Sequence, residues 1–454
     1  MGYRRPNIRY ESEKGKFYLP LPVQLHSDSE SNIFSQMNRF SDISSPENET
    51  LRPLHSGFCK KGQARKCTVE PVVIGGMVLD VNATSSMHAN PRTTTPGKVI
   101  FSLGGVARNV ADCISKLEAR PFMISAVGFD MAGNMLVEHW ESAGLSIEGI
   151  QRHQNIETAV VCHIFDEKGE VAAGVAHVES IEKFLTPRWI EKFKCKISST
   201  PILMVDANLN SSSLEASCQM AAQFNTPVWF EPVSVAKSRR VASVVQYVTF
   251  ASPNEDELVA MANAISGRDI FQPIRRDYSS TKLSKESFFQ MLKPAIWVLL
   301  DKGVKVVVVT LGSEGVLLCS KAKSNLKKLA FKGNQTPYST KQLHNAVNTV
   351  CPKDQIFGAS MFEPMSNLFA VHFPALPASV VRLTGAGDCL VGGMIASLCA
   401  GLDVMQSVAV GIAAAKVVVE VESNVPDEYC LAKLADDARS VYSGATMLLC
   451  QSKL

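Results

Sequence analysis

The sequence predicts an α/β fold of three layers, in which a mostly parallel central sheet is covered by helices on both faces. From residue 71 onward, short apolar runs bounded by turn residues alternate with stretches of helical periodicity. The chain has 454 residues, of which 46% are apolar, so it can bury a large core. Length alone allows two or three domains, but one three-layer domain can hold all of the alternating segments.

The strands of this sheet are predicted where apolar runs end at turn residues. They are residues 72–76, 122–127, 202–205, 228–230 and 305–310. Helices are predicted between them, for example at residues 109–119 and 255–264. Residues 316–319 follow a short glycine-containing turn and can return as an antiparallel strand.

Two regions depart from this alternation. Residues 93–103 and 157–171 alternate apolar and polar positions, which is typical of exposed antiparallel strands. Residues 320–377 form a long lysine-rich insertion of little periodicity, with no acidic residue between Glu314 and Asp354. We interpret the insertion either as a solvated loop or as a segment close to nucleotide phosphates.

The two ends differ from the predicted 67–440 domain. Residues 1–66 are rich in Ser, Asn and Arg and lack an apolar signal segment, so we expect a weakly ordered extension. Residues 441–454 form a tail that ends in Ser452-Lys453-Leu454, a peroxisomal address read by an import receptor. The tripeptide predicts a peroxisomal protein, and a cytoplasmic one is the alternative, because the signal works only when exposed.

Composition excludes several classes of protein. A net charge of +3, without a basic helix or aromatic-interleaved basic patch, gives no case for nucleic acid. The longest apolar runs are far too short to span a membrane. Twelve cysteines without a Cys-x-x-Cys pair fit reduced intracellular thiols rather than a disulfide framework or a zinc site.

The most informative motif is the string Leu-Thr-Gly-Ala-Gly-Asp at residues 383–388, which runs into an apolar helix at 389–400. Gly385 and Gly387 allow a sharp turn and a close approach to a ligand. A helix N-terminus presents free N–H groups and a partial positive charge, so it can bind an anion. Asp388 can take a proton there, although an ordinary N-cap turn would have the same pattern.

This string resembles the C-terminal signature of the PfkB, or ribokinase-like, family of sugar and nucleoside kinases, and the resemblance covers roughly residues 69–426. It implies a ribokinase-like fold in which 93–103 and 157–171 form a small β lid. It also implies ATP and Mg²⁺ as cofactors. Asp388 would be the catalytic base, and the backbone of Gly385, Ala386 and Gly387 would hold the transferring phosphoryl group.

The resemblance also implies the residues that bind the phosphoryl acceptor. Asp80 would bind sugar hydroxyls from the end of the first strand, although by itself it could be a turn or cap residue. Val106 stands where many ribose kinases have lysine, which argues against a plain ribokinase. The full set of acceptor-binding residues is Asp80, Asn82, Gly104, Gly105, Asn109 and Thr158.

For the nucleotide, the resemblance points to two further strings. Thr310, Gly312 and Gly315 match a Thr-x-Gly-x-x-Gly element along the ATP phosphates, although they could form a simple turn. Asn254 and Glu257 match an Asn-x-x-Glu element that organises magnesium, with Glu257 acting through water. By themselves they are an ordinary acidic first helical turn.

One departure from the family concerns monovalent cations. Arg382-Leu383 replace the Asp-Thr pair that most members carry, which makes activation by a monovalent cation doubtful.

Three further strings, at residues 73–80, 230–237 and 372–377, are most similar to plant-type pseudouridine kinases. The implied reaction is phosphorylation of the pseudouridine 5′-hydroxyl. The alternatives are a kinase for another nucleoside or ribose, and a non-catalytic binding protein of the same fold. Relatives often dimerise through the lid, so a homodimer is also considered.

Overall fold

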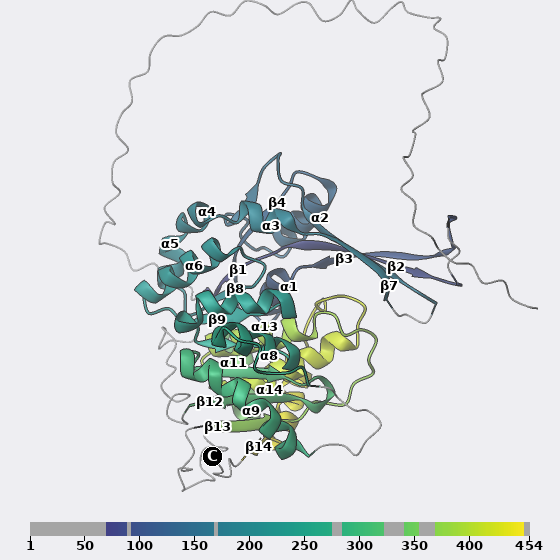
Figure 1. Ribbon diagram of the computed structural model, residues 1–454. Helices are drawn as coiled ribbons and strands as arrows, with labels where there is room; N and C mark the ends of the chain where they lie inside the picture. The colour runs from purple at the N-terminus through teal and green to yellow at the C-terminus, as the bar shows by residue number, and fades with distance from the viewer. Residues whose placement is uncertain are drawn as a thin grey trace, which may run out of the picture. The chain divides into compact units, whose positions relative to one another are not determined.

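The computed structural model describes residues 70–88, 92–167, 171–274, 284–321, 340–353 and 368–448. Their strands form one sheet of ten and one of four (Figure 1), and the predicted α/β class is confirmed. The predicted N-terminal extension 1–66 and the terminal Ser452-Lys453-Leu454 lie outside the described residues. Among the described residues, no helix is both long and apolar enough to cross a membrane.

The large sheet has the strand order β14-β13-β12-β11-β10-β9-β8-β1-β4-β5. Neighbours from β5 to β11 are parallel, whereas β12, β13 and β14 each pair antiparallel. The strands are β1 (Val72–Ile74), β4 (Phe122–Val127), β5 (Ile150–Arg152), β8 (Leu203–Asp206), β9 (Val228–Glu231), β10 (Phe250–Ala251), β11 (Val306–Thr310), β12 (Val316–Ser320), β13 (Phe369–Phe373) and β14 (Thr446–Met447).

Both faces of this sheet are buried, as expected for parallel strands with helical crossovers. Successive residues point to opposite faces, so Val306 and Val308 pack into one core and Val307 and Val309 into the other. The first core includes α1 (Val106–Lys116), α2 (Met131–Ser142), α11 (Lys341–Val350), α13 (Ala386–Cys399), α14 (Val404–Val419) and α15 (Leu431–Ser443). The second includes α3 (Glu179–Phe184), α4 (Pro187–Glu191), α5 (Lys194–Ser199), α6 (Ser211–Gln223), α8 (Glu255–Ser266) and α9 (Lys285–Lys302).

Short helical turns also occur among the described residues. They are α7 (Val235–Ser238) and the 3₁₀ segments η1 (Arg239–Ser243), η2 (Val245–Tyr247) and η3 (Gly312–Glu314). The last of these is the turn between β11 and β12, and β12 returns antiparallel as predicted.

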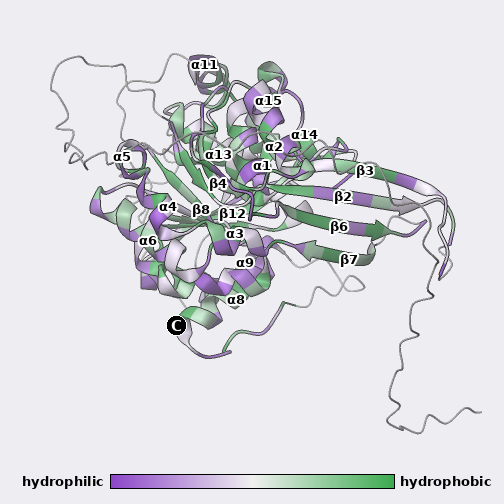
Figure 2. Cartoon of the chain, turned by 90° about the horizontal axis from the view of Figure 1, so that it is seen from above, coloured by the Kyte–Doolittle hydropathy of each residue, from purple (hydrophilic) through white to green (hydrophobic). Residues whose placement is uncertain are grey.

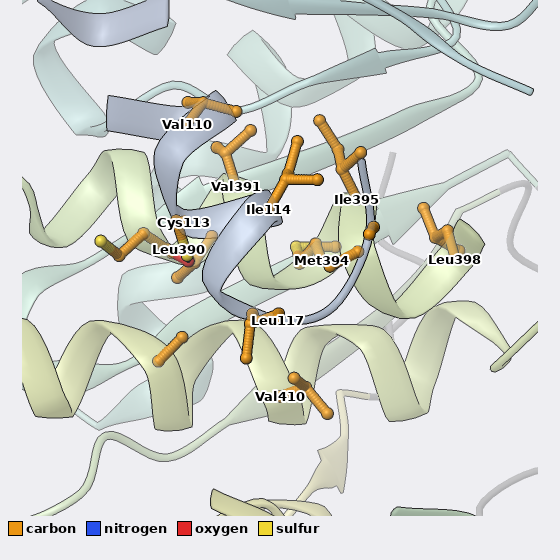
Figure 3. Close-up of a cluster of buried hydrophobic side chains, with 14 of the residues drawn as sticks. Val110, Cys113, Ile114, Leu117, Leu390, Val391, Met394, Ile395, Leu398 and Val410 are labelled. Atoms are coloured by element: carbon orange, nitrogen blue, oxygen red, sulfur yellow. The ribbon is translucent and has the colours of Figure 1, made fainter. Parts of the chain in front are cut away.

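Close packing of α1, α13 and α14 holds the two helices that carry the predicted site. Apolar side chains of α1, such as Ile114, face Met394 and its neighbours on α13 (Figure 3). A Cβ at Gly393 would lie 3.0 Å from the Gly411 Cα, so these glycines let α13 and α14 approach closely. Core packing of this density fixes the relative positions of the first turns of α1 and α13.

The small sheet is the predicted lid and has the order β3-β2-β6-β7. Its strands lie side by side (Figure 2). They are β2 (Val78–Ser85), β3 (Gly97–Gly104), β6 (Ala159–Phe165) and β7 (Val171–His177). The predicted segments 93–103 and 157–171 thus contain most of β3 and all of β6.

Asp80 lies inside lid strand β2, and its placement at the end of the first strand was wrong. The strand β1 stops at Ile74, and Gly75, Gly76 and Met77 separate it from β2, which joins the other sheet. The sequence prediction treated β1 and the start of β2 as one strand, because both belong to a single apolar stretch in which only the glycine pair intervenes. The consequence is that Asp80 belongs to the lid rather than to the central sheet.

The two faces of the lid differ. Asp80 and Asn82 share one face, whereas the opposite register positions carry apolar side chains. Phe101 is 51% exposed and Val175 is 73% exposed on that second face. An exposed apolar sheet face of this kind is typical of an interaction surface.

The prediction of an irregular insertion at 320–377 was wrong for the part that the structure describes. Helix α11 packs Leu343 and Val347 into the first core. Strand β13 is fully buried and pairs antiparallel with β12. A five-residue apolar strand carries too short a pattern to be separated from its polar surroundings. The lysine-rich residues 322–339 lie outside the described residues.

Candidate active site

The predicted glycine turn forms the start of α13. Gly385 is the N-cap residue with φ +87°, and a Cβ there would overlap the carbonyl oxygen of Asn424. Only glycine combines this φ with so close a contact. The helix begins at Ala386, whose N–H donates to the Leu383 carbonyl at 3.3 Å. A Cβ at Gly387 would meet nothing within 4 Å, so the space beside the first turn is open.

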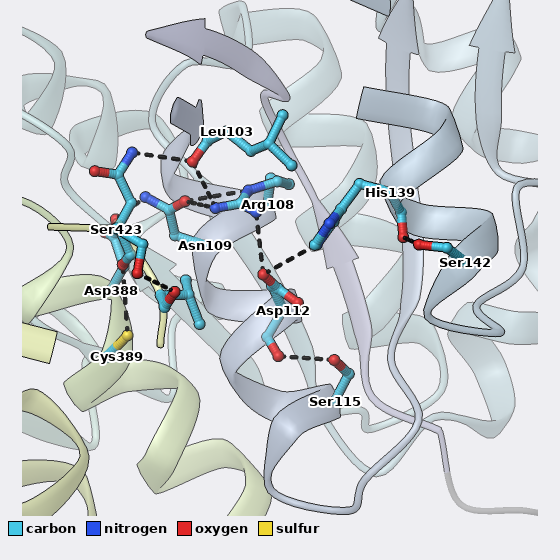
Figure 4. Close-up of polar contacts among 12 residues, drawn as sticks. Leu103, Arg108, Asn109, Asp112, Ser115, His139, Ser142, Asp388, Cys389 and Ser423 are labelled. Atoms are coloured by element: carbon cyan, nitrogen blue, oxygen red, sulfur yellow. Dashed lines mark hydrogen bonds and ion pairs between the residues drawn. The ribbon is translucent and has the colours of Figure 1, made fainter. Parts of the chain in front are cut away.

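Asp388 lies in this first turn and contacts Asn109 of α1. The Asn109 Nδ2 donates a hydrogen bond of 2.7 Å to Asp388 Oδ2 (Figure 4). Burial and the nearby charges of Asp206 and Asp80, opposed by Asn109 and Arg108, together raise the pKa of Asp388 to about 6. A carboxylate with such a pKa is suited to act as a general base near neutral pH.

Asp80 is held by a residue that the sequence prediction missed. The Asn424 Nδ2 donates to Asp80 Oδ2 at 2.8 Å and to the Leu103 carbonyl at 3.0 Å. Burial raises the pKa of Asp80, and the hydrogen bond from Asn424 opposes that rise. A Cβ at Gly104 would overlap the Asp80 carboxylate, which explains glycine at that position. Asn424 belongs to no motif, so no local signal indicated it.

Asn82 lies two residues from Asp80 on the same face of β2. Its Nδ2 donates to the Ser102 hydroxyl at 3.0 Å, and its buried Oδ1 has no hydrogen-bond partner among the described residues. A buried amide oxygen without a partner costs free energy unless a ligand donates to it. The arrangement therefore favours the predicted ligand-binding role.

Gly105 has φ +95°, and a Cβ there would overlap the Gly76 carbonyl, so glycine is required for the backbone itself. Thr158 has a structural function. Its hydroxyl donates to Asp130 Oδ1 at 2.6 Å and accepts from the Gly128 N–H at 2.8 Å. These bonds fix the start of α2, and contact of Thr158 with the acceptor stays a prediction.

The two predicted nucleotide strings lie side by side. Asn254 forms a parallel bridge with Thr310, whose N–H donates to the Pro253 carbonyl at 2.9 Å. Gly312 has φ +60° and open space where a side chain would be. Gly315 has φ +94°, and a Cβ there would overlap the Phe373 carbonyl, so its glycine is needed for packing against β13.

Asn254 and Glu257 form a capping box at the start of α8. The Asn254 side chain accepts from the Glu257 N–H at 2.9 Å, and Glu257 Oε2 accepts from the Asn254 N–H at 2.9 Å. The interpretation as an ordinary helix start is therefore correct for the local structure. Glu257 Oε1 is left for another partner, and burial raises the pKa of this carboxyl.

Glu231, at the end of β9, is a further buried carboxyl, and the charges of both Asp388 and Glu257 act on it. Ser252 donates a hydrogen bond to it, and burial followed by the charges of Glu257 and Asp388 raises its pKa well above the usual value. The sequence prediction missed Glu231, which reads as the last residue of an apolar strand.

The carboxyl groups of this site can accommodate a magnesium ion only if the ion keeps most of its water ligands. Among the described residues, no three His, Cys, Asp or Glu side chains are arranged to hold a metal. Magnesium keeps several waters and takes much of its ligation from substrate phosphates. Glu257, with one oxygen outside the capping box, can contact such an ion through water.

Comparison with known families identifies the chain. The family model described as pfkB family carbohydrate kinase matches residues 70–350 and 354–427. The chain belongs to the pfkB family. The protein is therefore a phosphotransferase with an alcohol group as acceptor.

The relatives of this pfkB member include two pseudouridine kinases. The one from Arabidopsis thaliana is 53% identical over 381 residues, which are 84% of this chain and 98% of the relative. The one from Escherichia coli is 27% identical over 199 residues, or 44% of this chain and 63% of the relative.

Solved structures show the same fold. Arabidopsis thaliana ribokinase complexed with ribose and ATP has a TM-score of 0.58 at 17% identity, covering 81% of this chain and 99% of that one. Cryptococcus neoformans ribokinase in complex with ADP has a TM-score of 0.56 at 19% identity, with the same two coverages. These similarities confirm the ribokinase-like fold of this pfkB member.

Proposed function

We propose that the protein is an ATP-dependent kinase that phosphorylates the 5′-hydroxyl of pseudouridine. The observation that carries the proposal is Asp388 in the first turn of α13, which Asn109 holds and whose pKa the charge of Asp80 raises. The 53% identity to the Arabidopsis pseudouridine kinase, over 98% of that chain, supports the choice of acceptor.

In the proposed reaction, Asp388 accepts the proton of the 5′-hydroxyl as that oxygen attacks the γ-phosphorus of ATP. The bond between this phosphorus and its bridging oxygen breaks, and ADP leaves. N–H groups of the first turn of α13 stabilise the charge on the transferring phosphoryl group. Magnesium neutralises phosphate charge when it is bound, and Glu257 orients its water shell. Asp80 binds the sugar hydroxyls.

The deciding experiment measures phosphate transfer from ATP with magnesium to pseudouridine, uridine, adenosine and ribose offered separately. We expect turnover on pseudouridine and a loss of about 100- to 10,000-fold in Asp388→Asn. Asp436→Asn, on the exposed side of α15, is the matched control and should behave as the wild type.

The other results of this experiment select the alternatives. Turnover on another acceptor would retain the kinase and discard pseudouridine. Nucleoside binding without turnover on any acceptor would indicate the non-catalytic binding protein.

We propose a peroxisomal location with the import receptor as partner. Support comes from the C-terminal Ser452-Lys453-Leu454. A fluorescent protein fused to the N-terminus should mark peroxisomes, and deletion of these three residues should return it to the cytoplasm. Identical distributions with and without the tripeptide would contradict the proposal.

We propose that two copies associate through their lids. Support comes from the exposed apolar face with Phe101 and Val175, which can stack on the same face of a second copy. In sedimentation equilibrium, the wild type should be a dimer and Val175→Glu a monomer. Met291→Glu changes an exposed residue of α9 as control. A monomeric wild type would refute the proposal.

A further inference from the structure

Arg108 is a buried cation on α1 that belongs to none of the predicted site residues. It is 2% exposed, and each branch of its guanidinium makes a hydrogen bond (Figure 4). Nη2 donates to the Leu103 carbonyl at 2.7 Å, Nη1 to Asp112 Oδ2 at 3.0 Å, and Nε to Asn109 Oδ1 at 3.2 Å. Moving a charged side chain out of water costs free energy even when the charge is well paired. The buried position of Arg108 therefore needs an explanation.

The first consequence concerns the orientation of the Asn109 amide. Because Oδ1 accepts from Arg108, Nδ2 must point to the other side, where it donates to Asp388 at 2.7 Å. A flipped amide would place its oxygen against the Asp388 carboxylate and its N–H groups against the guanidinium. Both contacts are repulsive, so Arg108 selects the orientation in which Asn109 holds the base.

The second consequence concerns Asp80. The Leu103 carbonyl accepts from Arg108 Nη2 and also from Asn424 Nδ2, which donates to Asp80. The same guanidinium thus fixes the backbone oxygen that orients the partner of Asp80. Asn109, which holds Asp388, is oriented by Arg108 directly. Asn424, which holds Asp80, is oriented by Arg108 through the Leu103 carbonyl.

The opposite side of Arg108 is closed by a counter-ion. Asp112 lies one helical turn later on α1, and His139 Nε2 of α2 lies 3.5 Å from Asp112 Oδ2. Burial by itself raises the pKa of Asp112, but the neighbouring His139 ring and the Arg108 charge bring it below its usual value. The Asp112 carboxylate therefore keeps its charge and holds the guanidinium in place.

We propose that Arg108 is a positioning residue that orients Asn109 against Asp388 and, through the Leu103 carbonyl, Asn424 against Asp80. The proposal rests on the proposed kinase function. Arg108 does so through other residues, and nothing in the arrangement requires it to touch the substrate.

The charge of Arg108 also acts on Asp388. The acidic groups around Asp388 come from four elements. They are Asp80 of β2, Asp206 of β8, Glu231 of β9 and the Cys389 thiol of α13. Arg108 lowers the pKa of Asp388 itself, whereas Arg382 and His163 act on Asp80 and Lys237 acts on Asp206. Removing Arg108 therefore raises the pKa of Asp388, and the acidic limb of the kcat profile moves to higher pH.

The test compares Arg108→Gln, Arg108→Lys and Lys116→Gln, which removes one positive charge from the same helix. We measure kcat and KM for both substrates from pH 5 to 9, together with thermal unfolding. We also titrate the Asp388 carboxyl by infrared difference spectroscopy, identifying its band by its absence in Asp388→Asn. This last readout does not depend on activity.

For Arg108→Gln we expect kcat to fall by about 10- to 100-fold with KM for ATP unchanged, because the base is displaced rather than the nucleotide. Its acidic limb and the infrared titration should both move to higher pH. Arg108→Lys keeps the positive charge but loses the planar guanidinium that makes several hydrogen bonds. The acidic limb of its pH profile should therefore stay at the wild-type pH, while kcat falls. Lys116→Gln should match the wild type.

If Arg108→Gln leaves both kcat and the position of the acidic limb of the pH profile unchanged, Arg108 serves stability alone, whether or not the melting temperature falls. If Arg108→Gln does not fold, an unchanged kcat in Arg108→Lys overturns the proposal. If the wild type phosphorylates no acceptor, the kinase function fails, and the infrared titration of Arg108→Gln still decides whether Arg108 acts on Asp388.

Discussion

Replacing Gly385 with alanine tests whether the glycine turn both starts α13 and holds the acceptor side of the site. A non-glycine residue at φ +87° costs about 1 kcal/mol. The added Cβ would also overlap the Asn424 carbonyl, which is backbone and must shift as a unit. Overpacking of this kind costs about 1–3 kcal/mol. We therefore expect Gly385→Ala to lower the free energy of unfolding by about 2–4 kcal/mol.

A functional loss should accompany the instability. Any shift of Asn424 moves its amide away from Asp80, so KM for the acceptor should rise while KM for ATP changes less. Urea unfolding followed by tryptophan fluorescence measures the stability, since Trp140 and Trp229 are fully buried. Steady-state kinetics with each substrate varied in turn measures the loss of function.

Gly387→Ala is the matched control two residues later. Its Cβ would enter open space, and alanine favours helix over glycine, so stability should stay level or rise by up to about 1 kcal/mol. Activity should nevertheless fall, because under the proposed function the methyl group stands beside the phosphoryl group. A Gly385→Ala protein within about 0.5 kcal/mol of the wild type would refute the reasoning.

Three further predictions concern the charges and amides of the site. The rate should fall below about pH 6, because Asp388 must be deprotonated to act as base and its pKa is about 6; a flat profile from pH 5 to 8 would contradict this. Asn424→Ala removes the donor to Asp80 and should raise the acceptor KM, whereas an unchanged acceptor KM would show that this bond is dispensable. Glu257→Gln keeps the oxygen that accepts from Asn254, so stability should change by less than about 1 kcal/mol. The magnesium concentration that gives half-maximal activity should be higher for Glu257→Gln than for the wild type, and an unchanged value would exclude Glu257 from the metal's surroundings. Chelation of magnesium should abolish wild-type activity.

Much of the fold could be predicted because its signals are local. Buried parallel strands such as Phe122–Val127 are nearly continuous apolar runs, and the predicted segment at 122–127 agrees with the structure at both ends. The start of α13 could also be predicted, because a glycine turn followed directly by an apolar helix is a pattern of residues that are adjacent in the sequence. Likewise, Asn254 and Glu257 stand three apart at a helix start, which is the spacing of a capping box.

What the sequence by itself determined is therefore the α/β class, strands and helices with a clear local pattern, and the turns that begin them, but not α11, β13 or the separation of β1 from β2. Tertiary structure alone decided that Asn109 meets Asp388 across 279 positions and that Asn424 meets Asp80 across 344. It also decided that Arg108 orients an amide in the site. The physical reason is that these bonds depend on the packing of α1 against α13 and of the lid against the segment between α14 and α15, and no local spacing records such packing.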